Sequence, residues 1–414
     1  MRCYLIGLET RFKSVEDDLD ELAALADSRG FTVVGRTSQK KAKDDPVFYV
    51  GKGKLHDIAR TTEDLEVDLY IVDDETSPSQ QRNMAKVLDK PVTDRTGLIL
   101  DIFAERANSS EGKLQVELAR SKYLLPRLIG VGADMSRLGG GIGTRGPGET
   151  KLETDRRKIR KRIRELELEI EHLIKQKDLT RRIRNQNETP LVCLVGYTNA
   201  GKSSLMAALT GSETYIDDRL FSTLDTTARR LNFASGGHVV LSDTVGFINK
   251  LPHQLVAAFR ATLKEVLAAD LLLHVVDVSS PGTGQRIKAV NNVLNELGVD
   301  PRCELMVYNK SDLLDPFSID NKELDLDNGV LISAQTGQGI EQLLARMKEL
   351  IYESSIELQI EVPYSRGDLL NLLYQNAMII QREDRQDGIV LLVRAKASIL
   401  GKVMNTLEDT ELEH

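Results

Sequence analysis

The sequence predicts an α/β fold made of several domains, and three observations support this prediction. A chain of 414 residues is too long for one hydrophobic core, so more than one domain is expected. Short apolar runs alternate with helical patterns over residues 1–100 and again after residue 190, which is typical of parallel βαβ units. A glycine-rich motif at 196–203 follows an apolar run at 191–195 and precedes a helical pattern, which is the arrangement of a phosphate-binding loop (P-loop).

We expect four parts along the chain. Residues 1–104 should form a parallel α/β domain, and residues 105–188 a long antiparallel helical hairpin with a glycine-rich, basic tip. Residues 189–355 should form the P-loop domain, which follows a polar linker ending at Pro190. Residues 356–414 carry strand and helix patterns without a catalytic motif and should form a small α+β domain.

The composition excludes some classes of protein. The formal net charge of -8 argues against a surface that coats nucleic acid throughout, so such contact must use local basic patches. The cysteines are far apart and beside apolar runs, which favours buried reduced thiols over metal or disulfide sites: Cys3, Cys193 and Cys303. No signal peptide opens the chain and no apolar run approaches the ~18 residues of a membrane span. We therefore expect a cytoplasmic monomer without a membrane segment.

The N-terminal part contains the pattern of a parallel sheet. Its expected strands and helices are at 3–8, 15–28, 31–34, 69–72 and 79–88. Between them, Gly51–Lys54 precedes a helical pattern at 55–60 and can bind an anion through backbone N–H groups. We favour the alternative, a glycine-rich turn with solvated lysines, because the complete phosphate-loop motif is absent.

The hairpin is predicted from two helical patterns and the segment between them. Apolar residues at helical spacing predict one helix over 105–125, and the second begins near residue 151. The segment between them, which follows Pro126, is rich in glycine and carries Arg127, Arg137 and Arg145. Residues 151–164 contain eight basic and two acidic residues, a net charge of +6 beside the glycine segment.

This basic tip has two interpretations. A solvated helix face is the simpler one, but the charge is concentrated at one end of a helix that becomes acidic further on, which favours contact with the backbone of an RNA. Aromatic side chains for base stacking are nearly absent, so the contact should depend on shape and phosphates. The residues we expect to make it are Arg137, Gly140, Gly141, Arg145, Arg156, Arg157, Arg160 and Lys161.

The P-loop motif predicts a nucleotide site that uses Mg²⁺. Its backbone N–H groups can surround the phosphates, Lys202 can reach the β- and γ-phosphates, and Ser203 can ligate the metal. Asn199 can hold a K⁺ ion against the phosphates or serve only in a turn, and both interpretations stay open. The nucleotide-contacting residues expected here are Gly196, Tyr197, Thr198, Asn199, Ala200, Gly201, Lys202, Ser203 and Ser204.

A second motif follows the apolar run at 239–241. Asp243 should stand at the end of a strand, where its carboxylate can reach Mg²⁺ through water, with Thr244 and Val245 beside it. Gly246 can offer its backbone N–H to the γ-phosphate. Phe247 stands where Ras-type enzymes carry a glutamine that orients the attacking water, so intrinsic hydrolysis should be slow unless a partner or another residue positions that water.

Two further motifs predict guanine as the base. Asn309, Lys310 and Asp312 follow a strand pattern at 303–308, and a carboxylate can accept hydrogen bonds from both N1–H and the amino group of guanine. Adenine has no donors at these positions. Ser333 and Ala334, after a strand pattern at 330–332, are placed to donate a backbone N–H to guanine O6. Four motifs in this order predict a GTPase that binds GTP and GDP.

The threonine that completes the Mg²⁺ site should lie in the segment 221–227, which begins at Phe221. Thr223, Thr226 and Thr227 are all candidates from the residues alone. A resemblance to a known family separates them. The runs at 138–150 and 153–157, together with 243–248 and 251–253, resemble the signature of HflX-type GTPases over nearly the whole chain.

This resemblance implies a ribosome-associated GTPase that binds the large ribosomal subunit, splits stalled or idle ribosomes under stress and hydrolyses GTP faster there. It also favours Thr223 as the switch threonine, with the hairpin tip reaching toward the peptidyl-transferase region. The catalytic set is then Lys202, Thr223, Asp243 and Gly246, with Ser203 and Thr223 on the metal. Some family members bind adenine nucleotides through the N-terminal domain, so an anion-binding role for Gly51–Lys54 remains a second hypothesis.

Two other functions are compatible with the sequence. The GTP form can act as an anti-association or hibernation factor for which hydrolysis is incidental, or the protein can serve ribosome assembly or RNA modification. The residues by themselves predict the GTPase, the hairpin and its contact with a polyanion. The ribosome as partner comes only from the resemblance.

Overall fold

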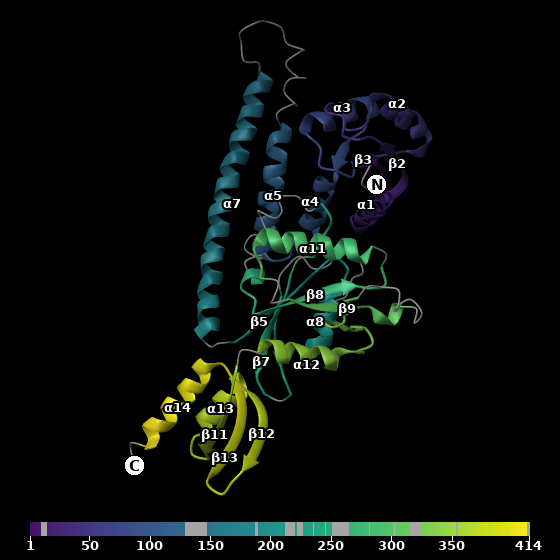
Figure 1. Cartoon of the computed structure of the whole chain (residues 1–414). Coiled ribbons are helices and arrows are strands. Elements are labelled where there is room, and N and C mark those ends of the chain that lie inside the picture. Colours follow the sequence, from purple (N-terminus) through teal and green to yellow (C-terminus); the bar gives the residue numbers. More distant parts are fainter. Residues whose placement is uncertain are drawn as a thin grey trace. The chain divides into compact units, whose positions relative to one another are not determined.

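The computed structural model shown in Figure 1 describes residues 1–9, 15–128, 147–186, 189–211, 220–221, 227–234, 236–244, 246–250, 265–280, 282–300, 304–314, 324–352 and 355–411. The chain forms two compact units, each with its own hydrophobic core. The first unit consists of Met1–Ile174, Asp217–Asp225 and Asn249–Ala261. The second consists of Lys175–Ile216, Thr226–Ile248 and Thr262–His414.

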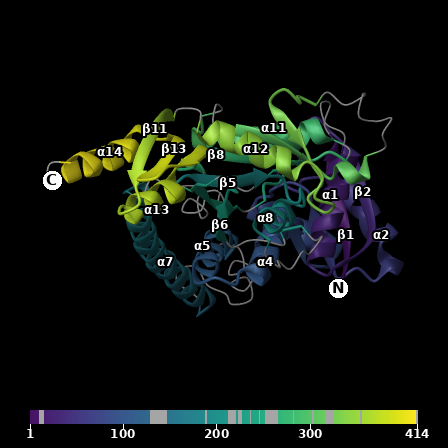
Figure 2. The same ribbon diagram turned by 90° about the horizontal axis from the view of Figure 1, so that it is seen from below.

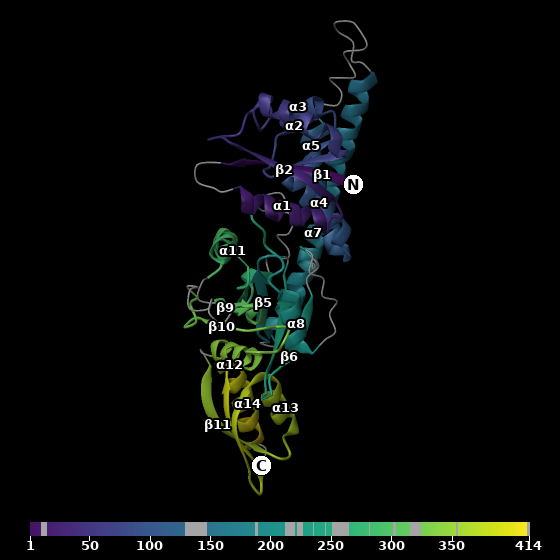
Figure 3. The ribbon, with the colours of Figure 1, turned by 90° about the vertical axis from the view of Figure 1, so that its right-hand side faces the viewer.

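The first unit contains a parallel sheet with the strand order β2-β1-β3-β4. Its strands are β1 (Arg2–Glu9), β2 (Thr32–Lys40), β3 (Leu69–Val72) and β4 (Val92–Asp94). Its helices are α1 (Glu16–Ser28), α2 (Lys52–Thr61), α3 (Pro78–Leu88) and α4 (Arg95–Arg106), with a short 3₁₀ helix at Glu63–Leu65. Figure 3 shows α1 and α4 on one side of this sheet and α2 and α3 on the other. Both faces are covered because parallel strands need crossover helices, and β1 and β3 are accordingly apolar and buried.

A cluster of buried charges lies at the carboxyl end of β3. Asp73 is fully buried and accepts a hydrogen bond from Arg95 Nη1 at 2.8 Å. Lys250, which belongs to the same compact unit, forms ion pairs with Asp73 and Asp74 and lies 3.3 Å from Asp18 Oδ2. The cluster compensates the buried carboxylates of Asp73 and Asp18, as buried charges require, and includes the partly exposed Asp74.

Two long helices form the hairpin, and they lie side by side in Figures 1 and 3. They are α5 (Ser110–Arg127) and α7 (Pro147–Gln186). Leu118 packs with Leu166 and Ile170 in a small apolar cluster between them. Glu117 accepts two hydrogen bonds from Arg162, at 2.6 and 2.8 Å, so charge as well as apolar area sets the register.

The prediction of one helix over 105–125 is wrong at its beginning. The chain ends α4 at Arg106 and starts α5 at Ser110, because the Ser109 side chain accepts the backbone N–H of Gly112 at 2.9 Å and caps the new helix. Strand β4 and helix α4 were not predicted. A three-residue strand has too few positions to show an alternating pattern.

The second unit contains a six-stranded sheet with the order β10-β9-β8-β5-β7-β6. The strands are β5 (Leu191–Gly196), β6 (Ala228–Asn232), β7 (His238–Asp243), β8 (Leu271–Asp277), β9 (Glu304–Asn309) and β10 (Gly329–Leu331), and only the β6–β7 pair is antiparallel. The helices α8 (Lys202–Thr210) and α12 (Ile340–Ile351) share one apolar core, and α11 (Thr283–Leu297) lies across the opposite face (Figure 1). The motifs of the sequence therefore stand at the carboxyl ends of β5, β7, β9 and β10, the edge where open α/β sheets bind ligands.

The C-terminal part of this unit, drawn in yellow in Figure 2, is a separate antiparallel sheet with the order β11-β13-β12. Its elements are β11 (Ile356–Pro363), α13 (Gly367–Asn376), β12 (Met378–Asp384), β13 (Gly388–Ala395) and α14 (Ala397–Glu411). It is joined to the turn between β6 and β7, where Gly237 N donates to Tyr374 O at 3.0 Å and His238 Nδ1 lies 2.7 Å from Gln375 O. The hairpin β6–β7 thus contacts the backbone carbonyls in the last turn of α13.

The fold class expected from the sequence is confirmed. A parallel α/β sheet, a helical hairpin, a P-loop sheet and a small antiparallel sheet with helices follow one another along the chain. Among the described helices, none combines the length and the apolar composition that crossing a membrane would require.

Candidate nucleotide-binding site

The phosphate-binding loop runs from the end of β5 to the start of α8. Gly196 has φ 152° and a Cβ added there would lie 2.3 Å from Val275 O, while Gly201 has φ 90° and an added Cβ would lie 2.2 Å from Asn309 Nδ2. Only glycine fits both the backbone conformation and the space at these positions. Ser203 and Ser204 follow in the first turn of α8, so the loop directs its N–H groups and a helix N-terminus at one point.

Lys202 is buried beneath this loop. Its Nζ donates to the carbonyls of Gly196, at 3.2 Å, and Tyr197, at 2.9 Å. Desolvation by burial lowers the pKa of Lys202 to about 8, and the nearby Asp243 carboxylate only partly opposes this. An anion at the loop would restore the ammonium by supplying a counter-charge, so phosphate binding and protonation of Lys202 are coupled.

This coupling predicts a pH dependence of nucleotide affinity. Below pH 8 Lys202 is charged before phosphate arrives, whereas above it binding must take up a proton. The affinity for GDP should therefore fall about fourfold between pH 7 and pH 8.5. Fluorescence titration with GDP at several pH values measures this, and guanosine, which lacks phosphate, should show no such fall in a competition experiment. An affinity for GDP that is constant over the range contradicts the prediction.

Ser203 and Asp243, which the sequence places at a magnesium ion, are hydrogen-bonded to each other in the structure. Ser203 Oγ donates to Asp243 Oδ2 at 3.1 Å. Asp243 Oδ1 is buried and has no hydrogen-bond partner among the described residues, and burial raises the pKa of this carboxyl group. An unpartnered buried carboxylate oxygen beside a hydroxyl is an arrangement that a hard cation with its water ligands would satisfy. The residues present therefore fit Mg²⁺.

The segment after β7 lies directly on the P-loop. Phe247 N donates to Gly196 O at 3.0 Å, and Thr198 N donates to Phe247 O at 2.8 Å. An added Cβ on Gly246 would lie 3.1 Å from Lys202 Nζ, so the Gly246 backbone borders the place where Lys202 meets phosphate. The Phe247 side chain is buried and apolar, and it has no group that could orient a water molecule.

Asn309 connects three parts of the site. Its Nδ2 donates to Ala200 O at 2.9 Å, and its Oδ1 accepts the backbone N–H of Ala334 at 3.0 Å. The same amide thus holds the P-loop against the loop that follows β10. Sequence reasoning placed Asn309 at the nucleotide but did not predict this bridge, because neither partner is near it in the chain.

The residues expected to contact guanine lie after the ends of β9 and β10. Asp312 lies in a 3₁₀ turn, Ser311–Leu313, with an exposed carboxylate that has no partner among the described residues. Ser333 N donates to Gln338 O at 2.9 Å, and Ala334 N is already bonded to Asn309. A contact from either N–H to guanine O6 would therefore require one of these hydrogen bonds to be exchanged.

Two residues that sequence reasoning missed border the site. Asp277, at the end of β8, pairs with Lys310 through Oδ2 and Nζ at 2.9 Å. Arg286 lies with its guanidinium 5.4 Å from the centre of the Tyr197 ring. Asp277 follows an apolar strand as Asp243 does, and this repeated pattern is the signal that could have identified it.

Several expected residues lie outside the described part of the chain or away from the P-loop. Thr223 and Val245 are outside the described residues. Phe221 belongs to the first compact unit, where its ring contacts that of Phe103 edge to face at 4.5 Å, and the neighbouring Leu220 N donates to Ser28 Oγ at 3.1 Å. Its expected nucleotide contact therefore stays a prediction.

Of the residues expected to contact RNA, half lie outside the described part of the chain and half lie on α7. Arg137, Gly140, Gly141 and Arg145 lie outside the described residues. Four others lie on α7: Arg156, Arg157, Arg160 and Lys161. Arg156 pairs with Glu153 at 3.8 Å and Lys161 with Glu165 at 3.6 Å, while Arg157 and Arg160 are exposed and have no ion pair with any described residue.

Comparison with known proteins covers nearly the whole chain. Four family models match in order: GTP-binding GTPase N-terminal at 16–104, GTP-binding GTPase Middle Region at 106–184, 50S ribosome-binding GTPase at 191–310 and HflX C-terminal domain at 318–404. GTPase HflX of Caldanaerobacter subterraneus is 46% identical over 94% of this chain and 90% of its own length. GTPase HflX of Escherichia coli K12 is 43% identical over 92% of this chain and 90% of its own length. The crystal structure of an SsGBP and GDP complex has a TM-score of 0.48 and 26% identity over 85% of this chain and 99% of its own.

The fold and the site define a GTP hydrolase of the P-loop class. The P-loop after β5, Asp243 at the end of β7 and Asp312 after β9 stand at the same carboxyl edge of one sheet. With the family models and relatives matching along its length, the chain belongs to the HflX family of GTPases.

Proposed function

We propose that this GTPase binds the large ribosomal subunit in its GTP form, dissociates stalled or idle ribosomes and hydrolyses GTP faster on the ribosome. The proposal extends to a cytoplasmic protein that acts during stress and is a monomer in solution. The observation that carries it is a group of exposed cations in the first half of α7, Arg157, Lys158 and Arg160, that have no ion pair with any described residue. The matched description 50S ribosome-binding GTPase supports the choice of partner.

The cations of α7 differ in whether they pair with carboxylates of the protein. Arg162 binds Glu117 through two hydrogen bonds and also lies 3.5 Å from Glu169 Oε1, so it serves the hairpin. In contrast, Arg157, Lys158 and Arg160 are exposed and have no ion pair with any described residue. A polyanion such as RNA would neutralise these neighbouring like charges, and counterions released from the RNA would favour the contact.

The nucleotide site supports the role of the ribosome in hydrolysis. Phe247 replaces the water-orienting side chain of Ras-type enzymes and is buried, so a partner must supply or position that group. Bound Mg²⁺ would be held by Ser203 and Thr223, with Asp243 acting through water, and would neutralise charge on the phosphates. Asn199, with φ 60°, suits a turn as well as a K⁺ site, and comparing hydrolysis in KCl and NaCl separates these roles.

Co-sedimentation with intact ribosomes and with separated subunits tests the function. Binding to the large subunit should be strong with a nonhydrolysable GTP analogue and weaker with GDP, and intact ribosomes should separate in its presence. Separation by the analogue would assign hydrolysis to release, whereas binding without separation would favour the anti-association role. Binding to neither particle in any nucleotide state would overturn the proposal.

Neutralising the unpaired cations should weaken this binding. The double variant Arg157→Gln and Arg160→Gln removes two phosphate contacts, so the slope of log affinity against log salt should decrease by roughly 1.4 to 1.8. Lys113→Gln with Lys175→Gln removes the same charge from exposed positions elsewhere on α5 and α7 and should leave the slope unchanged. If the two double variants show the same slope of log affinity against log salt, the basic segment is a solvated helix face and does not contact RNA.

A further inference from the structure

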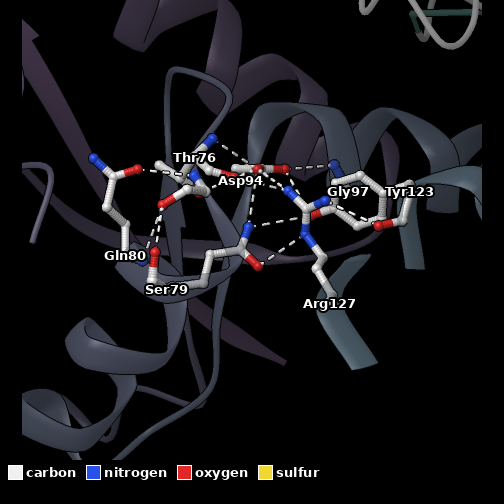
Figure 4. Close-up of polar contacts among 9 residues, drawn as sticks. Thr76, Ser79, Gln80, Asp94, Gly97, Tyr123 and Arg127 are labelled. Atoms are coloured by element: carbon white, nitrogen blue, oxygen red, sulfur yellow. Dashed lines mark hydrogen bonds and ion pairs between the residues drawn. The ribbon is translucent and has the colours of Figure 1, made fainter. Parts of the chain in front are cut away.

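Folded proteins pair their buried polar side chains, and Asp94 in the first compact unit follows this rule (Figure 4). Its carboxylate accepts hydrogen bonds from Tyr123 Oη at 2.8 Å, Arg127 Nη2 at 3.0 Å and the hydroxyl of Thr76 at 3.1 Å. A buried polar group without such a partner therefore requires an explanation. The hydroxyl of Thr198, in the P-loop of the second unit, is such a group.

Thr198 is the third residue of the P-loop, and its side chain is buried. The residue is 5% exposed, and Oγ1 has no hydrogen-bond partner among the described residues. The backbone of Thr198 is held in place, because its N–H donates to Phe247 O at 2.8 Å. The loop thus fixes this residue while its hydroxyl stays unpaired, which is unfavourable unless a ligand pairs with it.

Two polar side chains that line a cavity together with Thr198 have other partners. His274 Nδ1 lies 2.6 Å from Glu304 Oε1. Asp277 pairs with Lys310 Nζ at 2.9 Å. The partner of the Thr198 hydroxyl is therefore a group that does not belong to the described chain.

The side chain of Thr198 lies at the place where the γ-phosphate is expected. A Cβ added on Gly246 would lie 2.9 Å from Thr198 Cγ2 and 3.1 Å from Lys202 Nζ, so the three residues meet at one point. Gly246 and Lys202 are the residues expected to contact the γ-phosphate. The methyl and hydroxyl groups of threonine share one carbon, and rotation about χ1 exchanges their staggered positions. The hydroxyl can therefore reach the γ-phosphate.

We propose that Thr198 is a catalytic residue whose hydroxyl orients the water that attacks the γ-phosphate. A threonine hydroxyl can donate to a γ-phosphate oxygen and accept a hydrogen bond from the water at the same time. The water oxygen forms a bond to Pγ as the bond between Pγ and the β,γ-bridging oxygen breaks, and the electron pair of the broken bond stays on GDP. Both water protons leave on the released phosphate, so Thr198 is unchanged.

This role supplies what Phe247 lacks. The Phe247 side chain is buried and has no polar group, whereas the Thr198 hydroxyl lies beside Gly246 from the other side of the loop contact. A hydroxyl orients water but does not remove its proton at neutral pH, so hydrolysis by the protein alone stays slow. The inference concerns this intrinsic hydrolysis and does not depend on the ribosome.

Substitutions separate the hydroxyl from the methyl group. Thr198→Val keeps the shape and loses the hydroxyl, Thr198→Ser keeps the hydroxyl and loses the methyl group, and Thr198→Ala loses both. Single-turnover hydrolysis of GTP should be about tenfold slower in Thr198→Val and Thr198→Ala, because a hydrogen bond made to the attacking water is lost. Thr198→Ser should retain most of the wild-type rate. The affinity for GDP, which has no γ-phosphate, should not change in any of the three variants.

The experiment uses the full-length chain with Mg²⁺ and without ribosomes. Thr210→Val is the matched control, because it removes a hydroxyl that donates to Met206 O at 2.8 Å at the last residue of α8. It should hydrolyse GTP at the wild-type rate. Fluorescence titration with GDP and thermal unfolding show whether each variant is folded.

The pattern of rates decides the inference. Slow hydrolysis in the two variants without the hydroxyl, with GDP affinity retained, supports it. A wild-type rate in Thr198→Val overturns it, as does a rate that falls in Thr198→Ser and Thr198→Ala alone, which would assign a packing role to the methyl group. A loss of GDP affinity as large as the loss of rate also overturns it. If Thr198→Val does not fold, Thr198→Ser and Thr198→Ala still differ only in the hydroxyl, and equal rates in these two variants overturn the inference.

Discussion

Asp312→Asn is expected to lower the affinity for GDP and GTP about a thousandfold and to create a preference for xanthine nucleotides. The Asp312 carboxylate is exposed at the end of β9 and has no competing partner among the described residues. It can accept from N1–H and the amino group of guanine, whereas an amide leaves the guanine amino group facing another donor. Xanthine has a carbonyl there and restores both hydrogen bonds.

Competition between GDP and xanthosine diphosphate for a fluorescent nucleotide measures this switch. The matched control is Asp325→Asn, which changes an exposed carboxylate in the same unit that hydrogen-bonds Asn328 at 3.0 Å. It should leave the preference for guanine intact. Guanine selectivity that persists in Asp312→Asn would remove this residue from the base-binding role.

Lys250→Ala is expected to destabilise the first compact unit by about 3 kcal/mol. The lysine compensates Asp73, which is 1% exposed, and Asp18, which is 7% exposed, and it also pairs with Asp74. Arg95 still binds Asp73 in the variant, but the other two carboxylates lose their shared cation. A cation lost from beside a buried carboxylate such as Asp18 costs far more than an exposed ion pair provides.

Amide hydrogen exchange of β1 and β3 measures the loss of stability in the first compact unit. Lys250→Arg keeps the charge and should retain most of the protection. Lys113→Ala, an exposed change on α5 of the same unit, should alter the free energy of opening by less than about 0.5 kcal/mol. Protection in Lys250→Ala equal to that of the wild type would show that the cluster is solvated and contributes little.

Much of the fold and part of the site were predictable because their signals are local. The strands β3 and β5 are continuous apolar runs, and the P-loop glycines have a fixed spacing between a strand and a helix. The polar residue that follows each buried strand, such as Asp243, marks the carboxyl edge of the sheet without any knowledge of its neighbours. Parallel connectivity then brings these edges together, and this is why the nucleotide site could be anticipated.

The parts that could not be predicted depend on residues far apart in the chain. The amide of Asn309 bonds to Ala200, 109 residues away, and Lys250 finds Asp73 at a separation of 177. The start of α4 depended on a three-residue strand and the start of α5 on a serine cap, and both leave little periodic signal. Local patterns cannot specify such pairings, because packing of the sheet and helices selects them.

Arg127 and Arg157 illustrate the difference between what the sequence predicts locally and what long-range contacts decide. Both were basic residues beside a glycine-rich segment, and by composition alone they were equivalent. By itself the sequence determined the class of nucleotide site, the order of its motifs and the presence of a basic hairpin. Only the tertiary structure decided which cations pair with groups of the protein itself and which stay exposed to a partner. A buried charge must be paired inside the fold, whereas an exposed one need not be.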